Sequence, residues 1–125
     1  MVVDSDILID FFRDYAKAKT FFLGSNQVMR VSRLSVMEVI KGVVSKRNAL
    51  KALRQLDELG IEVVEVDAEL SEVAGDIFFD YWHKWGIGIV DSFVAATTLK
   101  LSDKLVTRNV RHFKNVEGLD LIVPY

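Results

Sequence analysis

The chain has 125 residues, of which half are hydrophobic and 27% are charged, and its net charge is -2 at pH 7. This is the size and composition of one globular domain, so we expect a single domain over residues 1–125 and exclude a disordered or fibrous chain. Cysteine is absent, which excludes disulfides, thiolate metal ligands and a cysteine nucleophile.

The sequence shows no sign of membrane insertion or export. No window reaches the roughly 18 apolar residues that a membrane-spanning helix needs. The first residues also lack the basic start and apolar run of a secretion signal. Because a chain without cysteine suits a reducing compartment, we expect a cytoplasmic protein that makes no membrane contact.

Short apolar runs along the chain predict five strands. They are Val2–Val3, Val28–Val31, Ile61–Val66, Leu105–Thr107 and Leu119–Val123. The segments between them are predicted helices, most clearly Ala68–Trp85 and Asp91–Leu101. Because strands alternate with helices, the sequence predicts an α/β fold with a central parallel sheet of four to five strands and helices on both faces.

Residues 68–85 carry apolar side chains at every third or fourth position, which is the pattern of a helix that buries one face. The stripe consists of Leu70, Val73, Ala74, Ile77, Phe78, Tyr81, Trp82 and Trp85. We interpret it as protein core or dimer interface and assign it no chemistry.

Charge is distributed unevenly along the chain. From Lys41 to Arg54 there are five basic residues and no acid, whereas from Asp57 to Asp80 there are nine acids and no base. The basic stretch fits contact with a phosphate backbone and a solvated helix face equally well. The acidic stretch is interpreted as solvated surface.

Polar side chains occur where a parallel sheet binds ligands, beyond the carboxyl ends of its strands. Asp4 follows the first predicted strand, and Asp6 comes two residues later. Glu38 lies one turn into the helix after the second strand. Asp91 begins the helix that follows a glycine turn, and Asn109 follows the fourth strand.

Some of these residues also have a purely structural explanation. Asp4 or Asp6 can cap the first helix, because an aspartate oxygen accepts hydrogen bonds from the free amides of a first turn. Ser35 and Glu38 have the spacing of a capping box.

The remaining positions are open to the same interpretation. Asp91 can cap its helix, with Ser92 as the alternative cap. Asn109 can simply support a turn.

Together, the carboxylates Asp4, Glu38 and Asp91 favour a metal site. Three carboxylates held within a few ångströms repel one another, and one stays protonated unless a cation compensates the charge. Hard oxygen ligands without histidine or cysteine select Mg²⁺ or Mn²⁺. Such an ion can hold a phosphate oxygen, lower the pKa of a bound water and neutralise developing charge, which predicts hydrolysis of a phosphodiester.

Four segments, in this order, resemble the motifs of the PIN-domain family, in particular its VapC-type toxins. They are VVDSDILID at residues 2–10, VSRLSVMEVIKG at 31–42, IVDSFVAATTL at 89–99 and LVTRNVRHF at 105–113. Each segment alone is weak, but the four together cover nearly the whole chain at family-like separations. The resemblance implies a PIN-like three-layer fold.

The resemblance also implies roles for residues of these segments. Asp4 and Asp91 would bind the metal, Glu38 would complete the acidic cluster, and Asn109 and Thr107 would complete the catalytic site.

Two positions depart from the family pattern. Asp6 stands where many relatives have asparagine, so it is either an additional ligand or a helix cap. Asn109 stands where some relatives have a fourth aspartate, which favours one metal ion over two. Ser5, Arg108 and Arg111 lie next to the site residues in sequence and are candidates for supporting the site or contacting RNA phosphates, although ordinary surface roles explain them too.

The function implied is that of an Mg²⁺- or Mn²⁺-dependent endoribonuclease toxin that hydrolyses RNA with a metal-activated water. The same resemblance implies a homodimer, a VapB-like antitoxin that blocks the site, and binding of operator DNA only as a complex with that antitoxin. His83 and His112 are interpreted as surface or packing residues rather than a catalytic pair.

Two alternatives start from the same residues. Asp4 and Asp6 after an apolar strand resemble the nucleophile and acid of a haloacid dehalogenase-type phosphatase, but the chain is short for one and lacks the later acidic pair. A receiver-like signalling module, which is not an enzyme, fits the size and the position of Thr107. That family has lysine before its late proline, however, and here Val123 precedes Pro124.

Overall fold

The computed structural model describes residues 1–125 and contains the predicted alternation of strands and helices. The strands are β1 (Val2–Val3), β2 (Arg30–Ser32), β3 (Glu62–Val64), β4 (Lys104–Val106) and β5 (Asp120–Ile122). The helices are α1 (Ser5–Phe12), α2 (Ala16–Gly24), α3 (Arg33–Lys41), α4 (Lys46–Glu58), α5 (Ala68–Trp85), α6 (Ile89–Lys100) and α7 (Val110–Phe113). All five predicted strands are present, with bounds shifted by up to two residues.

The five strands form one parallel sheet in the order β3-β2-β1-β4-β5. This arrangement confirms the predicted α/β fold. From β1 the chain builds the sheet outward through β2 and β3, then returns to the other side of β1 with β4 and β5. The change of direction makes the carboxyl ends of β1 and β4 the switch point at which such sheets bind ligands.

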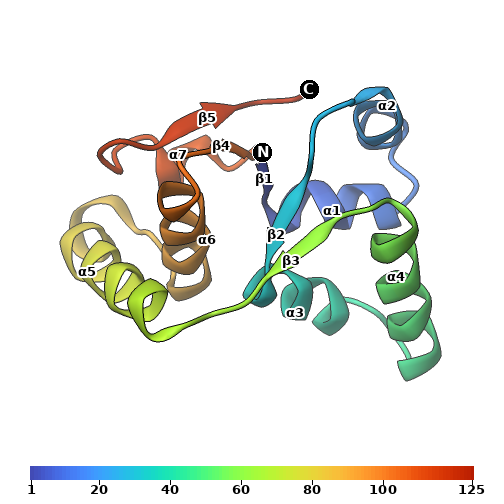
Figure 1. Cartoon of the computed structure of the whole chain (residues 1–125), viewed down its shortest axis with the longest axis horizontal. Coiled ribbons are helices and arrows are strands. Elements are labelled where there is room, and N and C mark those ends of the chain that lie inside the picture. The colour runs from blue at the N-terminus through green and yellow to red at the C-terminus, as the bar shows by residue number, and fades with distance from the viewer.

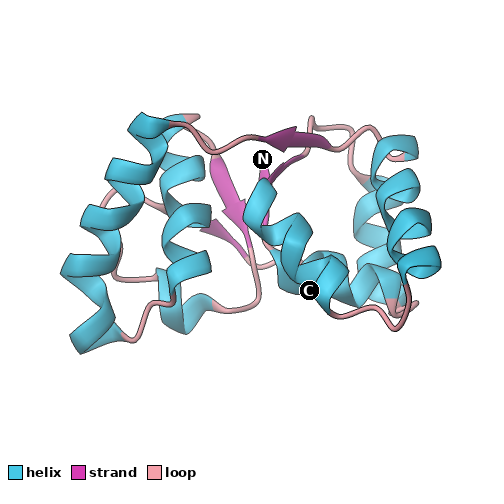
Figure 2. Ribbon diagram, turned by 90° about the horizontal axis from the view of Figure 1, so that it is seen from below, coloured by secondary structure: helices cyan, strands magenta, loops and turns pink.

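Helices cover both faces of the sheet (Figures 1 and 2). Successive strand residues point to opposite faces. Val3 and Val106 accordingly belong to the apolar core beneath α1 to α4, whereas Val2 and Leu105 belong to the core beneath α5 to α7. Both faces of the short central strands are therefore buried, which fixes the loops at their carboxyl ends. None of the helices is both long and apolar enough to span a bilayer.

The apolar stripe of α5 divides into two parts. Leu70, Ala74 and Ile77 are buried in the core, as predicted. Trp82 and Trp85 near the end of the helix are 49% and 38% exposed. The core interpretation therefore holds for the first part of the stripe, and the last turns lie at the surface.

Candidate functional site

Asp4 and Thr107 lie side by side at the carboxyl ends of the two central strands. The register pairs Val3 with Val106, so the residues that follow them are neighbours. The Asp4 amide donates to the Val106 carbonyl at 3.0 Å, and the Thr107 hydroxyl donates to Asp4 Oδ2 at 2.8 Å. Both side chains are almost completely buried.

Asp4 is also the N-cap of α1, as one of the structural interpretations predicted. Its Oδ1 accepts a hydrogen bond from the Ser5 amide at 2.8 Å. With Thr107 on its other oxygen, the carboxyl group is held in one orientation. The end of β1 and the beginning of α1 therefore fix the central acid of the site.

Glu38 reaches the site from α3, which packs against α1. The Ser5 hydroxyl donates to Glu38 Oε2 at 2.6 Å and lies 3.5 Å from Asp4 Oδ1. Ser5 thus links two carboxylates that are 34 positions apart in the chain. This contact brings Glu38 next to Asp4, as the sequence predicted.

The predicted capping box at Ser35 is wrong. The N-cap of α3 is Ser32, whose hydroxyl accepts from the Leu34 amide at 3.3 Å. Strand β2 runs to Ser32, so the helix begins three residues earlier than the capping pattern indicated. Ser35 lies inside the helix, buried, and its hydroxyl has no hydrogen-bond partner.

Asp91 lies in the first turn of α6, but it is not the N-cap that the sequence suggested. The cap is Gly88, whose extended backbone starts the helix, and Asp91 Oδ2 accepts from the Gly88 amide at 3.2 Å. Ser92, the other proposed cap, instead donates its hydroxyl to the Gly88 carbonyl at 2.8 Å. Asp91 therefore supports the helix start from its third position and keeps its carboxylate at the surface of the site.

His112 is a residue of the site that the sequence analysis missed. Its Nδ1 lies 2.9 Å from Asp91 Oδ2 and 2.8 Å from Asn109 Nδ2. Because one ring nitrogen cannot donate to Asp91 and accept from Asn109 at once, a proton on Nδ1 favours the contact with Asp91. The sequence spacing does indicate this position: His112 comes three residues after Asn109 at the start of a helix, and residues with that spacing share a face of the helix.

Asn109 connects the last motif to the central acid. Its backbone amide donates to the Thr107 hydroxyl at 2.9 Å, while that hydroxyl donates to Asp4. Asn109 is the N-cap of α7, but its side chain makes no capping hydrogen bond. Its amide group faces His112 instead.

Asp6 and Arg108 meet beside this cluster. Asp6 Oδ2 accepts from the Arg108 amide at 2.9 Å, whereas Asp6 Oδ1 is buried without a partner. The Arg108 guanidinium bonds to Asp10 at 2.8 Å and lies over the Tyr125 ring, so it is already engaged. Arg111 is exposed and forms no ion pair.

Burial and neighbouring charge act on the central acid in the same direction. Burial removes water from Asp4, and the negative charges of Asp6 and then Asp91 add to this, raising the pKa of Asp4 to about 7. Hydrogen bonds from Thr107 and Ser5 oppose the rise. Burial likewise raises the pKa of Asp6. Near neutral pH the site therefore gains from taking up either a proton or a cation.

The donor chemistry fits a hard divalent ion, although the ligands are not arranged as a finished cage. Asp4, Glu38 and Asp91 offer carboxylate oxygens, and Asp6 adds a buried oxygen without a partner. As they stand, however, no three histidine or acidic side chains are placed to hold one ion together. Ser5, Thr107 and His112 occupy several of the carboxylate oxygens, so coordination requires side chains to turn.

Replacing Thr107 with valine is expected to destabilise the protein by about 1–3 kcal/mol, because valine leaves both Asp4 Oδ2 and the Asn109 amide without their partner. Urea unfolding measures the effect. Thr98→Val is the matched control, since the equally buried Thr98 hydroxyl bonds only to a carbonyl of its own helix. An equal loss of unfolding free energy in the two variants would contradict the role given to Thr107.

Comparison with known proteins agrees with this architecture. The sequence profile of the PIN domain matches residues 1–119. No curated protein matches the chain significantly by sequence.

Several solved structures have the same fold. The DNA-bound VapBC complex of Salmonella typhimurium contains a chain that superposes with a TM-score of 0.80 at 20% identity, covering 99% of this chain and 97% of that one. A toxin-antitoxin complex from Klebsiella pneumoniae gives 0.78 at 22% identity, with coverage of 99% and 97%. VapC20 of Mycobacterium tuberculosis, a toxin that cleaves the sarcin-ricin loop, gives 0.76 at 16% identity, with coverage of 95% and 98%.

Proposed function

Because the chain belongs to the PIN domain family, we propose that its acidic site is that of a divalent-metal-dependent endoribonuclease. The observation that carries the proposal is the convergence of Asp4 and Glu38 on Ser5, with Asp91 near enough to raise the pKa of Asp4. The profile match over residues 1–119 favours this function over the haloacid dehalogenase and receiver alternatives.

In this proposal Asp4, Asp91 and Glu38 hold one Mg²⁺ or Mn²⁺ ion. When bound, the ion supplies Lewis-acid polarisation of a phosphate oxygen and lowers the pKa of a water molecule. Asp6 is a fourth candidate ligand because its Oδ1 has no other partner. The oxygen-only donor set supports this choice of ion.

The other residues of the site orient the acids. Thr107 holds Asp4 Oδ2 and ties it to the backbone of Asn109, so strand β4 fixes the angle of the carboxyl group. Ser5 holds Glu38 against Asp4. His112 holds Asp91, and the positive charge that it carries when protonated offsets part of the negative charge of the cluster.

We further propose that the chain is the toxin of a VapBC-type pair and forms a homodimer. The support for the pairing is the similarity of its fold to chains of the VapBC complex from Salmonella typhimurium and the toxin-antitoxin complex from Klebsiella pneumoniae. A VapB-like antitoxin would inhibit the chain by covering the acidic site. Operator DNA would then be bound by the complex rather than by this chain alone.

Incubation of the purified protein with single-stranded RNA, with Mg²⁺ or with chelator, tests the proposed activity. We expect internal cleavage that requires the ion and leaves a 5′-phosphate and a 3′-hydroxyl, because water rather than the RNA 2′-hydroxyl attacks. Mapping of the product ends distinguishes the two routes. Products with 2′,3′-cyclic phosphates, or equal cleavage in chelator, would contradict the proposal.

A further inference from the structure

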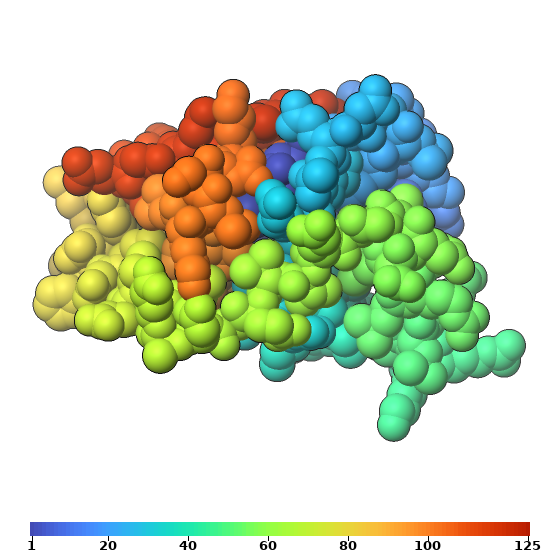
Figure 3. Space-filling model, in the orientation of Figure 1, coloured from blue at the N-terminus to red at the C-terminus, as the bar shows by residue number.

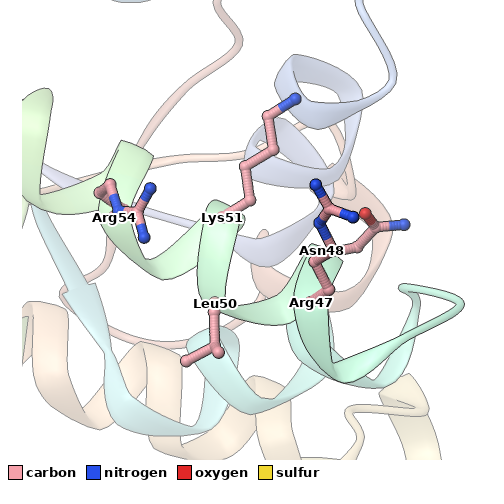
Figure 4. Close-up of a pocket in the computed structure, with 5 residues that line it drawn as sticks. All are labelled: Arg47, Asn48, Leu50, Lys51 and Arg54. Carbon is pink, nitrogen blue, oxygen red and sulfur yellow. The ribbon is translucent and has the colours of Figure 1, made fainter.

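One face of α4 carries cations that no acid of the chain neutralises. Arg47, Lys51 and Arg54 are exposed and recur at intervals of four and three residues, which places them along one side of the helix. Figure 4 shows these side chains around an open hollow that Asn48 and Leu50 also line. The space-filling view shows the start of α4 projecting from the body of the protein in green (Figure 3).

Several cations elsewhere in the chain are neutralised by acids, whereas those of α4 are not. Lysines and arginines that form ion pairs with carboxylates are Lys19, Arg30, Arg33, Lys100, Lys104 and Arg108. No cation of α4 is among them. The acid whose charge Lys51 does feel, Asp14, is already bonded to Lys19. The positive charge of α4 is therefore available to a ligand.

The hollow on α4 shares lining residues with a neighbouring hollow. Lys51 and Asn48 also line a second hollow with Phe12 and Val43. Phe12 and Val43 in turn line a third, together with Val39. The third hollow therefore lies against α3, the helix that carries Glu38.

We propose that the basic face of α4, defined by Arg47, Lys51 and Arg54, binds the phosphate backbone of the RNA strand outside the acidic site. Arg47 and Arg54 are separated by about 10 Å along the helix, so the face can contact more than one phosphate of a strand. Arginine forks match phosphate oxygens, and the half-buried Phe12, which lines the neighbouring hollow, offers a surface on which a base can stack. The proposal rests on the nuclease function proposed above.

RNA fits this face better than an amphipathic protein segment does. The hollow on α4 has Leu50 as its one apolar lining residue and is otherwise lined by three cations and an amide. A protein helix would need an apolar floor at this position to gain affinity. A polyanion needs only the cations, and their counterions are released when it binds.

The test is the salt dependence of binding of a labelled single-stranded 20-nucleotide RNA to the full chain, in chelator so that no cleavage occurs. The double variant Lys51→Gln/Arg54→Gln is compared with Lys84→Gln/Lys104→Gln, which removes the same charge from α5 and β4. We expect the α4 variant to bind about tenfold more weakly or worse near 0.1 M salt, with the slope of log K against log salt reduced by about 1.4. The control should bind like the wild type.

Several outcomes would overturn the proposal. The first is equal RNA binding by the α4 variant and the control, and the second is no RNA binding by the wild type. The third is that the α4 variant binds poly-glutamate more weakly than the wild type does but binds RNA as well as the wild type. Circular dichroism melting shows whether the α4 variant folds. Cleavage by the wild type with unaltered RNA binding by the α4 variant would refute this inference alone. RNA binding that depends on α4 without any cleavage would refute the nuclease function alone.

Discussion

Replacing Asp91 with asparagine is expected to lower the rate of RNA cleavage at least about a thousandfold, which corresponds to roughly 4 kcal/mol of transition-state stabilisation. Asparagine keeps an oxygen that can accept from the Gly88 amide, so the start of α6 should survive. It removes the negative charge that we propose to bind the ion and the charge that faces His112. Initial rates on single-stranded RNA with Mg²⁺ measure the effect.

The matched control for this variant is Asp80→Asn. Asp80 is an exposed acid of α5 with no ion pair, so the same change of charge and shape there should leave cleavage unaltered. Unfolding curves of both variants show whether the fold is retained. Cleavage by Asp91→Asn at the wild-type rate would remove Asp91 from the mechanism.

Replacing Asp4 with asparagine is expected to abolish cleavage and to change how stability depends on pH. In the folded protein the pKa of Asp4 is about 7, whereas in the unfolded chain it is near its ordinary value of 3.8. Below pH 4 both the folded and the unfolded state hold the proton, so the protonated carboxyl contributes fully to the free energy of unfolding. Between pH 4 and 7 only the folded state holds it, and that contribution is lost as the pH rises.

The free energy of unfolding of the wild type in chelator should therefore fall across this range, by at most about 1.4 kcal/mol per pH unit from Asp4. Asparagine does not titrate, so the variant should gain stability relative to the wild type as the pH increases from 4 to 7. The amide cannot satisfy the donors of both Ser5 and Thr107, which adds a loss that does not depend on pH. Urea unfolding at several pH values measures the difference.

The pH dependence of this difference separates the titration of Asp4 from a simple loss of packing. Asp6 also has a raised pKa and remains in the variant, so part of the wild-type decline should persist. A difference between Asp4→Asn and the wild type that stays constant from pH 4 to 8 would contradict the protonation of a buried Asp4.

The sheet and the acids that end its strands were predictable because both depend on local patterns. Apolar runs separated by helices identify buried parallel strands, and a polar residue directly after such a run falls at the ligand-binding edge. Asp4 satisfied both criteria, and its capping role followed from the helix that starts at Ser5. The order of the strands, which makes β1 and β4 neighbours, came from long-range packing that no local pattern encodes.

Helix starts were less predictable because several polar residues competed for the same role. Ser32 and Ser35 both precede apolar positions, and the choice between them depended on where β2 ends. At the start of α6, Gly88 took the cap because its backbone is extended there.

The contact between His112 and Asp91 was not predictable from either segment alone. It arises because the short helix α7 packs against α6, which brings together residues 21 positions apart. The pairing of Arg108 with Asp10 and Tyr125 is similar, since it joins three distant parts of the chain. In both cases the residue type indicated a polar role, and only the tertiary fold supplied the partner.

The most direct test of the proposed site is a calorimetric titration of Mn²⁺ into the wild type and the Asp4→Asn variant at pH 7, in two buffers of different ionisation heat. We expect the wild type to bind the ion and to release protons from Asp4, so that its apparent binding heat depends on the buffer. The variant should bind far more weakly and without this dependence. Identical isotherms for the two proteins, or no binding by the wild type, would contradict a metal site built on Asp4.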